Sequence, residues 1–148
     1  MKVDKEQVLR SSPLFDMLSP PELEILAELS RPRRFATGEV VFHEGDQGDS
    51  LFVLARGAVE VVSRRNGKES VFAVLEAPEA FGEMSLIDRE VRSATVRAKG
   101  DCVALQLSAE NFTAFRKRSR DGFTLFLVNV ARILSSRLRE TNHKIASG

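Results

Sequence analysis

The sequence predicts an α+β fold: an antiparallel, jelly-roll-like β-roll flanked by an N-terminal helical bundle and a C-terminal pair of helices. Apolar residues recur at helical spacing up to about residue 30, and the same period returns after residue 107. Between these regions lie short β-branched or aromatic runs separated by glycine, a pattern typical of a sandwich or barrel. We expect one domain over residues 1–148, with helices at 1–31, the β-roll at 32–107 and helices at 108–148.

The clearest helix start near the N-terminus is Ser19. It is followed by Pro20 at the first helical position and by Glu22 three residues after the serine, which is the pattern of a capping box. An apolar stripe then runs through Leu23, Ile25, Leu26 and Leu29. The sequence therefore predicts a helix that ends near Ser30 and places this stripe against the core.

Six short strands are expected in the β-roll. Two connections between them have strong turn chemistry: the run 45–49, Gly-Asp-Gln-Gly-Asp, and the Asn66-Gly67 pair, which suits a type I′ hairpin. Neighbouring strands should therefore be antiparallel. The expected strands are Val40–Phe42, Leu51–Ala55, Ala58–Ser63, Ser70–Leu75, Ser93–Ala98 and Cys102–Leu107.

Two helices are expected at the C-terminal end. Ser108 is a candidate N-cap for a short helix through Arg118, and a longer helix follows Asp121-Gly122 and ends near Lys144. The first part of the long helix has almost no polar face, so we expect it to be covered on more than one side. A homodimer through the helix 121–138 would supply that cover, and burial within the chain's own core is the alternative.

Composition excludes several classes of protein. There are 22 basic and 21 acidic residues and a formal charge of +1, so no global field favours nucleic acid or a membrane surface. One cysteine, Cys102, cannot form an intramolecular disulfide. The N-terminus lacks an apolar signal region, and no run of about 18 apolar residues occurs. We expect a cytoplasmic protein with no membrane contact.

The chemistry is concentrated in residues 81–96, Phe-Gly-Glu-Met-Ser-Leu-Ile-Asp-Arg-Glu-Val-Arg-Ser-Ala-Thr-Val. Gly82 lets a ligand approach the main chain, and residues 83–87 resemble one helical turn whose free N–H groups would face an anion. Glu83 can accept hydrogen bonds from sugar hydroxyls. Arg92, at the entry to a strand, has a planar guanidinium that suits the paired oxygens of a phosphate, and Ser93 adds a hydroxyl and an N–H.

This segment closely resembles the phosphate-binding cassette of the cyclic nucleotide-binding domain family, which includes the catabolite activator protein and the regulatory subunits of cyclic-AMP-dependent protein kinase. Phe-Gly-Glu-x-x-Leu, a short loop and Arg-Ser-Ala-Thr-Val carry the resemblance. Further motifs resemble the family's first hairpins and its N-terminal bundle, so the likeness extends to about residue 140. These motifs are at residues 13–15, 38–42, 44–46, 48–52 and 56–61.

The resemblance implies a role for each polar group. Glu83 would bind the ribose 2′-hydroxyl with the Gly82 backbone, Arg92 would pair with the phosphate, and the N–H groups of Ser85 and Ser93 would complete the site. The full ligand-binding set is Gly82, Glu83, Met84, Ser85, Arg92, Ser93 and Ala94.

The base is placed less directly. Phe72, Leu75 and Leu86 are candidates for an apolar wall, with core packing as the alternative, and the resemblance puts Arg137 near the position of the residue that caps the purine. Because family members that prefer cyclic GMP often have Thr after the arginine, Ser93 favours cyclic AMP over cyclic GMP. We expect a regulatory module without cofactor, metal or catalytic residues, which signals to an unidentified protein when its last helix closes over the base.

Four alternatives stay open. A metal cupin would need more ligands than His43 and His143, and the same counts disfavour a haem or redox sensor. The fold could serve as a dimerisation or docking module that binds no nucleotide. It could also be the sensor half of a longer transcription factor, although we expect no DNA contact from this chain, whose basic cluster at 116–120 is typical of a solvated helix end.

Overall fold

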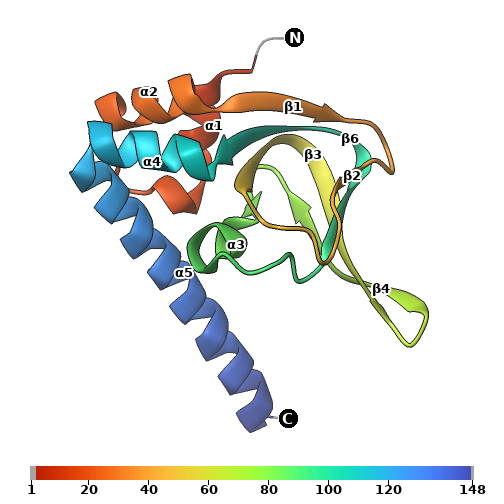
Figure 1. Cartoon of the computed structure of the whole chain (residues 1–148). Coiled ribbons are helices and arrows are strands. Elements are labelled where there is room, and N and C mark those ends of the chain that lie inside the picture. The colour runs from red at the N-terminus through yellow and green to blue at the C-terminus, as the bar shows by residue number, and fades with distance from the viewer. Residues whose placement is uncertain (1–2, 148) are drawn as a thin grey trace.

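The computed structural model describes residues 3–147, and the side chains of residues 3–142. Helices gather at one end, a curved antiparallel sheet forms the other, and the last helix runs diagonally past both (Figure 1). The predicted α+β class and the order of helices, β-roll and helices are confirmed. None of the helices in residues 3–147 combines the length and the apolar character that crossing a bilayer requires.

The N-terminal bundle holds α1 (Lys5–Ser11), the 3₁₀ turn η1 (Pro13–Phe15) and α2 (Pro20–Leu29). The predicted start of α2 is confirmed, because the Glu22 carboxylate accepts hydrogen bonds from the Ser19 N–H at 2.8 Å and from its hydroxyl at 2.9 Å. The bundle therefore begins from local capping and closes by burial of Leu23 and Leu26.

The sheet contains β1 (Arg31–Phe35), β2 (Val40–Phe42), β3 (Ser50–Arg65), β4 (Lys68–Glu76), β5 (Ala80–Phe81) and β6 (Thr95–Ser108). Its order is β1-β6-β3-β4, with β2 also pairing β6 and β5 pairing β3, and every pair is antiparallel as predicted. The hairpin between β3 and β4 projects from the body (Figure 1).

The prediction of separate strands at 51–55 and 58–63, and at 93–98 and 102–107, was wrong. Each pair is one long strand, β3 or β6, and the break is a bulge where the register shifts around Arg56. Gly57 has φ +81°, and a Cβ there would lie 2.6 Å from the carbonyl oxygen of Asp101. The glycine thus allows the strand to bend and continue, where the sequence suggested that it ends.

Two clusters form the core. One joins the helices to the adjoining ends of β3 and β6, and the other fills the roll with aromatic side chains, among them Phe52 and Phe81 stacked at 5.3 Å. The second cluster contains both ends of the predicted cassette, Phe81 and Val96. Packing of the roll therefore fixes where the cassette begins.

The C-terminal helices are α4 (Ala109–Arg118) and α5 (Arg120–Ser147). Ser108 caps α4 as predicted, accepting from the Asn111 N–H at 3.1 Å. On α5, Phe126 and Val130 are buried, whereas Leu127 and Val128 are 41% and 39% exposed. The helix is covered on one side, and part of its apolar surface lies open.

Candidate functional site

A cavity of about 460 Å³ opens where the roll, the short helix α3 (Glu83–Asp88) and α5 meet. Its volume falls in the range of small-molecule sites. The whole predicted ligand-binding set lines it, and so do one predicted wall residue from β4 and the predicted cap from α5: Gly82, Glu83, Met84, Ser85, Arg92, Ser93, Ala94, Leu75 and Arg137. The structure brings together residues that are up to 62 positions apart, from Leu75 to Arg137.

Arg92 is 4% exposed and its guanidinium is held on several sides. Its Nη1 donates to the Gly82 carbonyl oxygen at 2.9 Å and its Nη2 to that of Ser50 at 2.6 Å. The guanidinium carbon lies 3.9 Å from the centroid of the Phe42 ring, a close cation–π contact. Among the described side chains, the Nε of Arg92 is the one buried nitrogen or oxygen atom with no hydrogen-bond partner.

Burial lowers the pKa of Arg92, and the nearby carboxylates of Asp49, Asp46 and Glu83 act in the opposite direction. An arginine stays protonated despite such a shift, so a fixed positive charge lines the cavity, and the Nε of this guanidinium has no hydrogen-bond partner in the described part of the chain. A buried donor without a partner costs free energy, and the charge on the same guanidinium would attract an anion that enters the cavity.

Gly82 is the left-handed residue that turns the chain from β5 into α3. Its φ is +86°, and a Cβ would lie 2.8 Å from Arg92 Nη1 and 3.0 Å from the Ser50 carbonyl oxygen. Only glycine meets both requirements. The first N–H groups of α3, including that of Ser85, have no carbonyl four residues earlier in the helix to bond to.

Glu83 is buried at the first position of α3, and its side chain is 7% exposed. Its Oε1 accepts from Nη1 of Arg137, at 3.2 Å. The structure thus places the predicted sugar-binding carboxylate and the predicted base-capping arginine in one ion pair at the cavity. The positive charge that an anion needs comes from Arg92, and the acceptor that a hydroxyl group needs comes from Glu83.

Two predicted wall residues lie elsewhere. Phe72 is 58% exposed and sits at a bulge, because Val61 pairs with Ala73 and Val62 with Val71; its ring contacts the guanidinium of Arg65. Ala73 lines the cavity with Leu75, two residues along β4, whereas Phe72 is three residues from Leu75 and lies on the opposite face.

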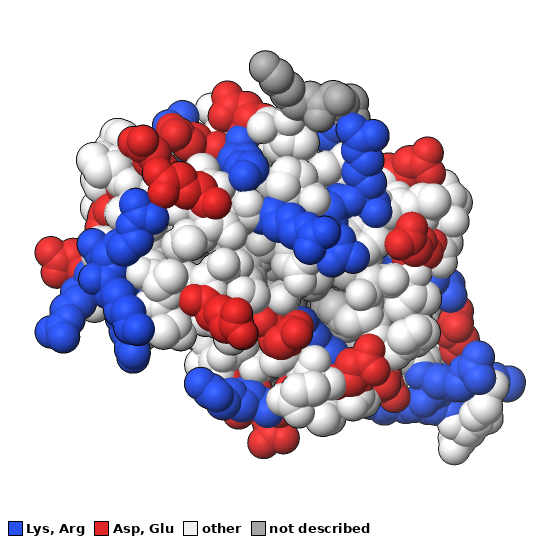
Figure 2. All heavy atoms as spheres, turned by 45° about the horizontal axis from the view of Figure 1, so that its top comes forward, with Lys and Arg blue, Asp and Glu red and all other residues white. Residues whose placement is uncertain are grey.

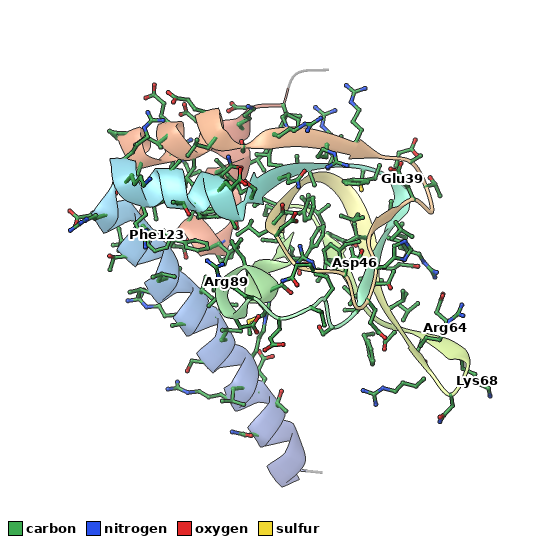
Figure 3. All side chains as sticks on the ribbon, viewed as in Figure 1. Glu39, Asp46, Arg64, Lys68, Arg89 and Phe123 are labelled. Atoms are coloured by element: carbon green, nitrogen blue, oxygen red, sulfur yellow. The ribbon has the colours of Figure 1, made fainter. Side chains whose placement is uncertain are left out.

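Leu86 lines a separate cavity of about 210 Å³ between α3, α4 and α5. Arg89 and Phe123, which border this second cavity, are labelled in Figure 3. Four side chains that sequence reasoning missed form the floor of the main cavity, in register on adjacent strands: Phe42, Val96, Val61 and Ala73. Period-two alternation along these strands was the available signal.

The loop between β2 and β3 is part of the site's frame, a role that turn chemistry alone did not indicate. The Arg92 N–H donates to the Asp46 carbonyl oxygen at 2.7 Å, and the Gly45 N–H donates to that of Arg92 at 2.8 Å. Asp46 is labelled in Figure 3. The cassette is therefore fixed to a loop that lies more than forty residues earlier in the chain.

His43, a residue considered for a metal site, follows β2 and is exposed, while the side chain of His143 lies outside the described part of the chain. In the described part, no group of three or more His, Cys, Asp and Glu side chains is arranged to hold a metal ion. On the face in Figure 2, acidic and basic side chains are interspersed, in keeping with the net charge of +1.

Comparison with known proteins supplies the family. The model described as "Cyclic nucleotide-binding domain" matches residues 32–119, more than half of the chain. The "Cyclic AMP receptor protein" of Thermus thermophilus is 35% identical over 135 residues, covering 90% of this chain and 61% of that protein. A "cAMP-dependent protein kinase regulatory subunit" of Blastocladiella emersonii is 34% identical over 109 residues, covering 73% of this chain and 27% of that protein.

The fold agrees with these matches. The crystal structure of the Thermus thermophilus catabolite activator protein superposes with a TM-score of 0.80 and 34% identity, over 90% of this chain and 62% of that one. The chain therefore spans less than two thirds of the curated relatives it matches first. A matched family model, a shared fold and the predicted cassette lead to one conclusion: the chain belongs to the cyclic nucleotide-binding domain family.

Proposed function

We propose that this chain binds one cyclic mononucleotide in the 460 Å³ cavity and acts as a ligand-sensing regulatory module without catalytic activity. The observation that carries the proposal is the buried guanidinium of Arg92, a fixed positive charge that lines the cavity and whose Nε has no hydrogen-bond partner in the described part of the chain. A phosphodiester supplies a permanent anion for it, and its two exocyclic oxygens suit a guanidinium and the adjacent N–H groups.

The remaining groups divide the ligand between them. Arg92 and the N–H groups of Ser85 and Ser93 bind the phosphate, and Glu83 with the Gly82 backbone binds the ribose 2′-hydroxyl. Met84 and Ala94 border the same cavity. The apolar floor on β2, β3, β4 and β6, together with Leu75, receives the purine, which is flat and largely apolar on its faces.

We propose cyclic AMP as the preferred ligand and cyclic GMP as the weaker one. Ser93 is the residue that favours this choice, and the similarity to a protein named as a cyclic AMP receptor supports it. A direct test is calorimetric titration with cyclic AMP, cyclic GMP and linear 5′-AMP. We expect saturation at one cyclic AMP per chain and weaker binding of the other two; absence of binding by either cyclic nucleotide contradicts the proposal.

Nucleotide binding is coupled to the rest of the protein through α5. Arg137 borders the cavity and contacts Glu83, so a ribose hydroxyl at Glu83 changes a contact that α5 makes. We propose that ligand binding closes α5 over the base, with Arg137 as the cap and residues 119–122 as the hinge. Helix α4 ends at Arg118 and α5 begins at Arg120, so Ser119 lies outside both helices at the start of this hinge.

The open surface of α5 supports a second proposal, a homodimer through residues 121–138. Leu127, Val128 and Leu138 are 41%, 39% and 62% exposed, and a two-fold pair of helices would bury them. Mass measurement in solution tests this pairing, with and without cyclic AMP. We expect a dimer, and a monomer at micromolar concentration contradicts it. A dimer that binds no nucleotide would favour the docking-module alternative.

A further inference from the structure

The loop between β2 and β3 lies close to α3 where Gly48 faces Ser85. A Cβ on Gly48 would lie 2.0 Å from the Ser85 Cβ, 2.7 Å from its Oγ and 3.3 Å from the Arg92 guanidinium carbon. Carbon atoms in contact prefer about 3.5–4.0 Å, so there is no room for a methyl group. The need for glycine here is one of space, unlike Gly45, whose φ of +90° demands a left-handed backbone.

Neither side of this contact is free to move independently of the ligand-binding groups. Ser85 is 7% exposed and lies two residues after Glu83 in the same short helix. The loop is held by the bonds between Arg92 and the backbone of Asp46 and Gly45, and further along by the Ala109 N–H, which donates to the Asp49 carbonyl oxygen at 2.8 Å. A displaced loop would therefore shift Arg92, and a displaced helix would shift Glu83.

We propose that Gly48 is a positioning residue of the nucleotide site, and that positions 48 and 85 together set the distance between α3 and Arg92. Only one of the two positions can carry a side chain while the cassette keeps its place. A Cβ at both would force a separation on the order of 1–2 Å, which exceeds the tolerance of a binding site to misplaced groups, about 0.5 Å. The inference rests on the proposed function only in its readout by nucleotide affinity.

The test is a double-mutant cycle with Gly48→Ala and Ser85→Gly, read by calorimetric titration with cyclic AMP. In the otherwise unmodified protein, Gly48→Ala should weaken cyclic AMP binding at least about tenfold, because Arg92 and α3 can no longer both keep their positions in the site. In the Ser85→Gly background, where the clashing Cβ and Oγ are absent, the same change should weaken binding less than about threefold. The recovery distinguishes placement of the cassette from a general loss of stability.

A matched control adds the same methyl group away from the site. Gly67→Ala lies in the turn between β3 and β4, where a Cβ would meet nothing within 4 Å. Any strain from its φ of +76° stays in that turn, so affinity should be unchanged. The idea is overturned if Gly48→Ala binds cyclic AMP as the unmodified protein does, or if it costs as much affinity in the Ser85→Gly background as in the natural one.

Amide hydrogen exchange on the protein without nucleotide separates this inference from the proposed function. Gly48→Ala should raise exchange rates in residues 83–88, and the added Ser85→Gly change should lower them again towards the value of Ser85→Gly alone. If the unmodified protein binds neither cyclic nucleotide, the proposed function fails while this exchange pattern still supports or refutes the packing relation. Unaltered exchange in Gly48→Ala refutes it.

Discussion

Nη1 of Arg137 lies 3.2 Å from Oε1 of Glu83, which joins the last helix of the chain to the first residue of α3. The two side chains differ in burial: that of Glu83 is 7% exposed and that of Arg137 is 58% exposed. The carboxylate is fixed and the guanidinium is free to leave or share it. A ligand hydroxyl that reaches Glu83 therefore acts on α5 through Arg137.

Arg137→Ala should uncouple α5 from the site without removing the site. Arg137 is more than half exposed, but its removal leaves the buried Glu83 carboxylate without this partner, so the free energy of unfolding in urea should fall by about 1–3 kcal/mol. We expect cyclic AMP still to bind, weaker by up to about tenfold, while the protection of amides 123–138 on binding is lost. Hydrogen exchange with and without cyclic AMP measures this directly.

Arg139→Ala is the matched control, since it removes an exposed arginine from the same helix. It should retain the full protection of amides 123–138. Equal protection in Arg137→Ala and the unmodified protein would contradict the proposed route through Glu83.

Glu83→Gln, titrated with cyclic AMP and with 2′-deoxy cyclic AMP, tests whether Glu83 binds the ribose 2′-hydroxyl. A hydrogen bond to a charged group is worth about 1.5–3 kcal/mol, so the variant should bind cyclic AMP roughly 10- to 150-fold more weakly. The unmodified protein should lose a similar factor for 2′-deoxy cyclic AMP, and the variant should discriminate little between the two nucleotides. Full discrimination by Glu83→Gln, measured by calorimetry, would assign the 2′-hydroxyl to another residue.

Asn129→Ala should destabilise the helical end of the molecule. Asn129 is 4% exposed on α5, and its side-chain nitrogen donates to the carbonyl oxygens of Leu14 at 3.0 Å and Asp16 at 2.8 Å. Loss of both bonds, with a buried acceptor left unpaired, should lower the free energy of unfolding by about 2–3 kcal/mol. Urea titration measures it, and Asn142→Ala, an exposed position on the same helix, should change it by less than about 0.5 kcal/mol.

Glu22 gives the stability a pH dependence of predictable sign. Burial raises the pKa of Glu22, but hydrogen bonds from the N–H and hydroxyl of Ser19 and the hydroxyl of Ser119 outweigh it, so the pKa is lowered. A carboxyl with a lowered folded-state pKa stabilises the fold above its unfolded value, and the contribution disappears as pH falls through the folded value.

Glu22→Gln should therefore lower the free energy of unfolding at pH 7 by less than about 1 kcal/mol, because solvent screens this largely exposed carboxylate, and the difference from the unmodified protein should vanish in acid. Urea titration across this pH range measures the difference. Glu24→Gln, an exposed change on the same helix, should leave the pH profile unaltered. A constant difference at every pH would contradict the assigned role of the charge.

Local chemistry made much of the fold predictable. The caps at Ser19 and Ser108 are short-range patterns, and the structure contains both helices where the serines predict them. The bulge at Gly57 was not predictable, because a glycine between two apolar runs is equally compatible with a turn. The choice between a turn and a bulge depends on the neighbouring strand, where Asp101 lies against Gly57, and Asp101 is far from Gly57 in sequence.

The site followed the same division. Glu83 and Arg92, which the sequence predicts as ligand-binding residues, both line the cavity, and their chemistry and spacing are contained in one segment. Phe72 was misplaced although it lies three residues from Leu75, a spacing that alternation along a strand puts on opposite faces. Phe42 and Gly48 were missed because they act on the cassette from a distant loop and strand.

Binding of cyclic AMP by Arg92→Ala, compared with Arg97→Ala, tests the central claim most directly. Arg97 is a matched control: it lies five residues along the same segment, on β6, and pairs with Glu60 and Glu69 away from the cavity. Removing the buried partner of a desolvated phosphate should cost Arg92→Ala roughly two to three orders of magnitude in affinity, while Arg97→Ala binds within about threefold of the unmodified protein. Equal, tight binding by folded Arg92→Ala would contradict the account.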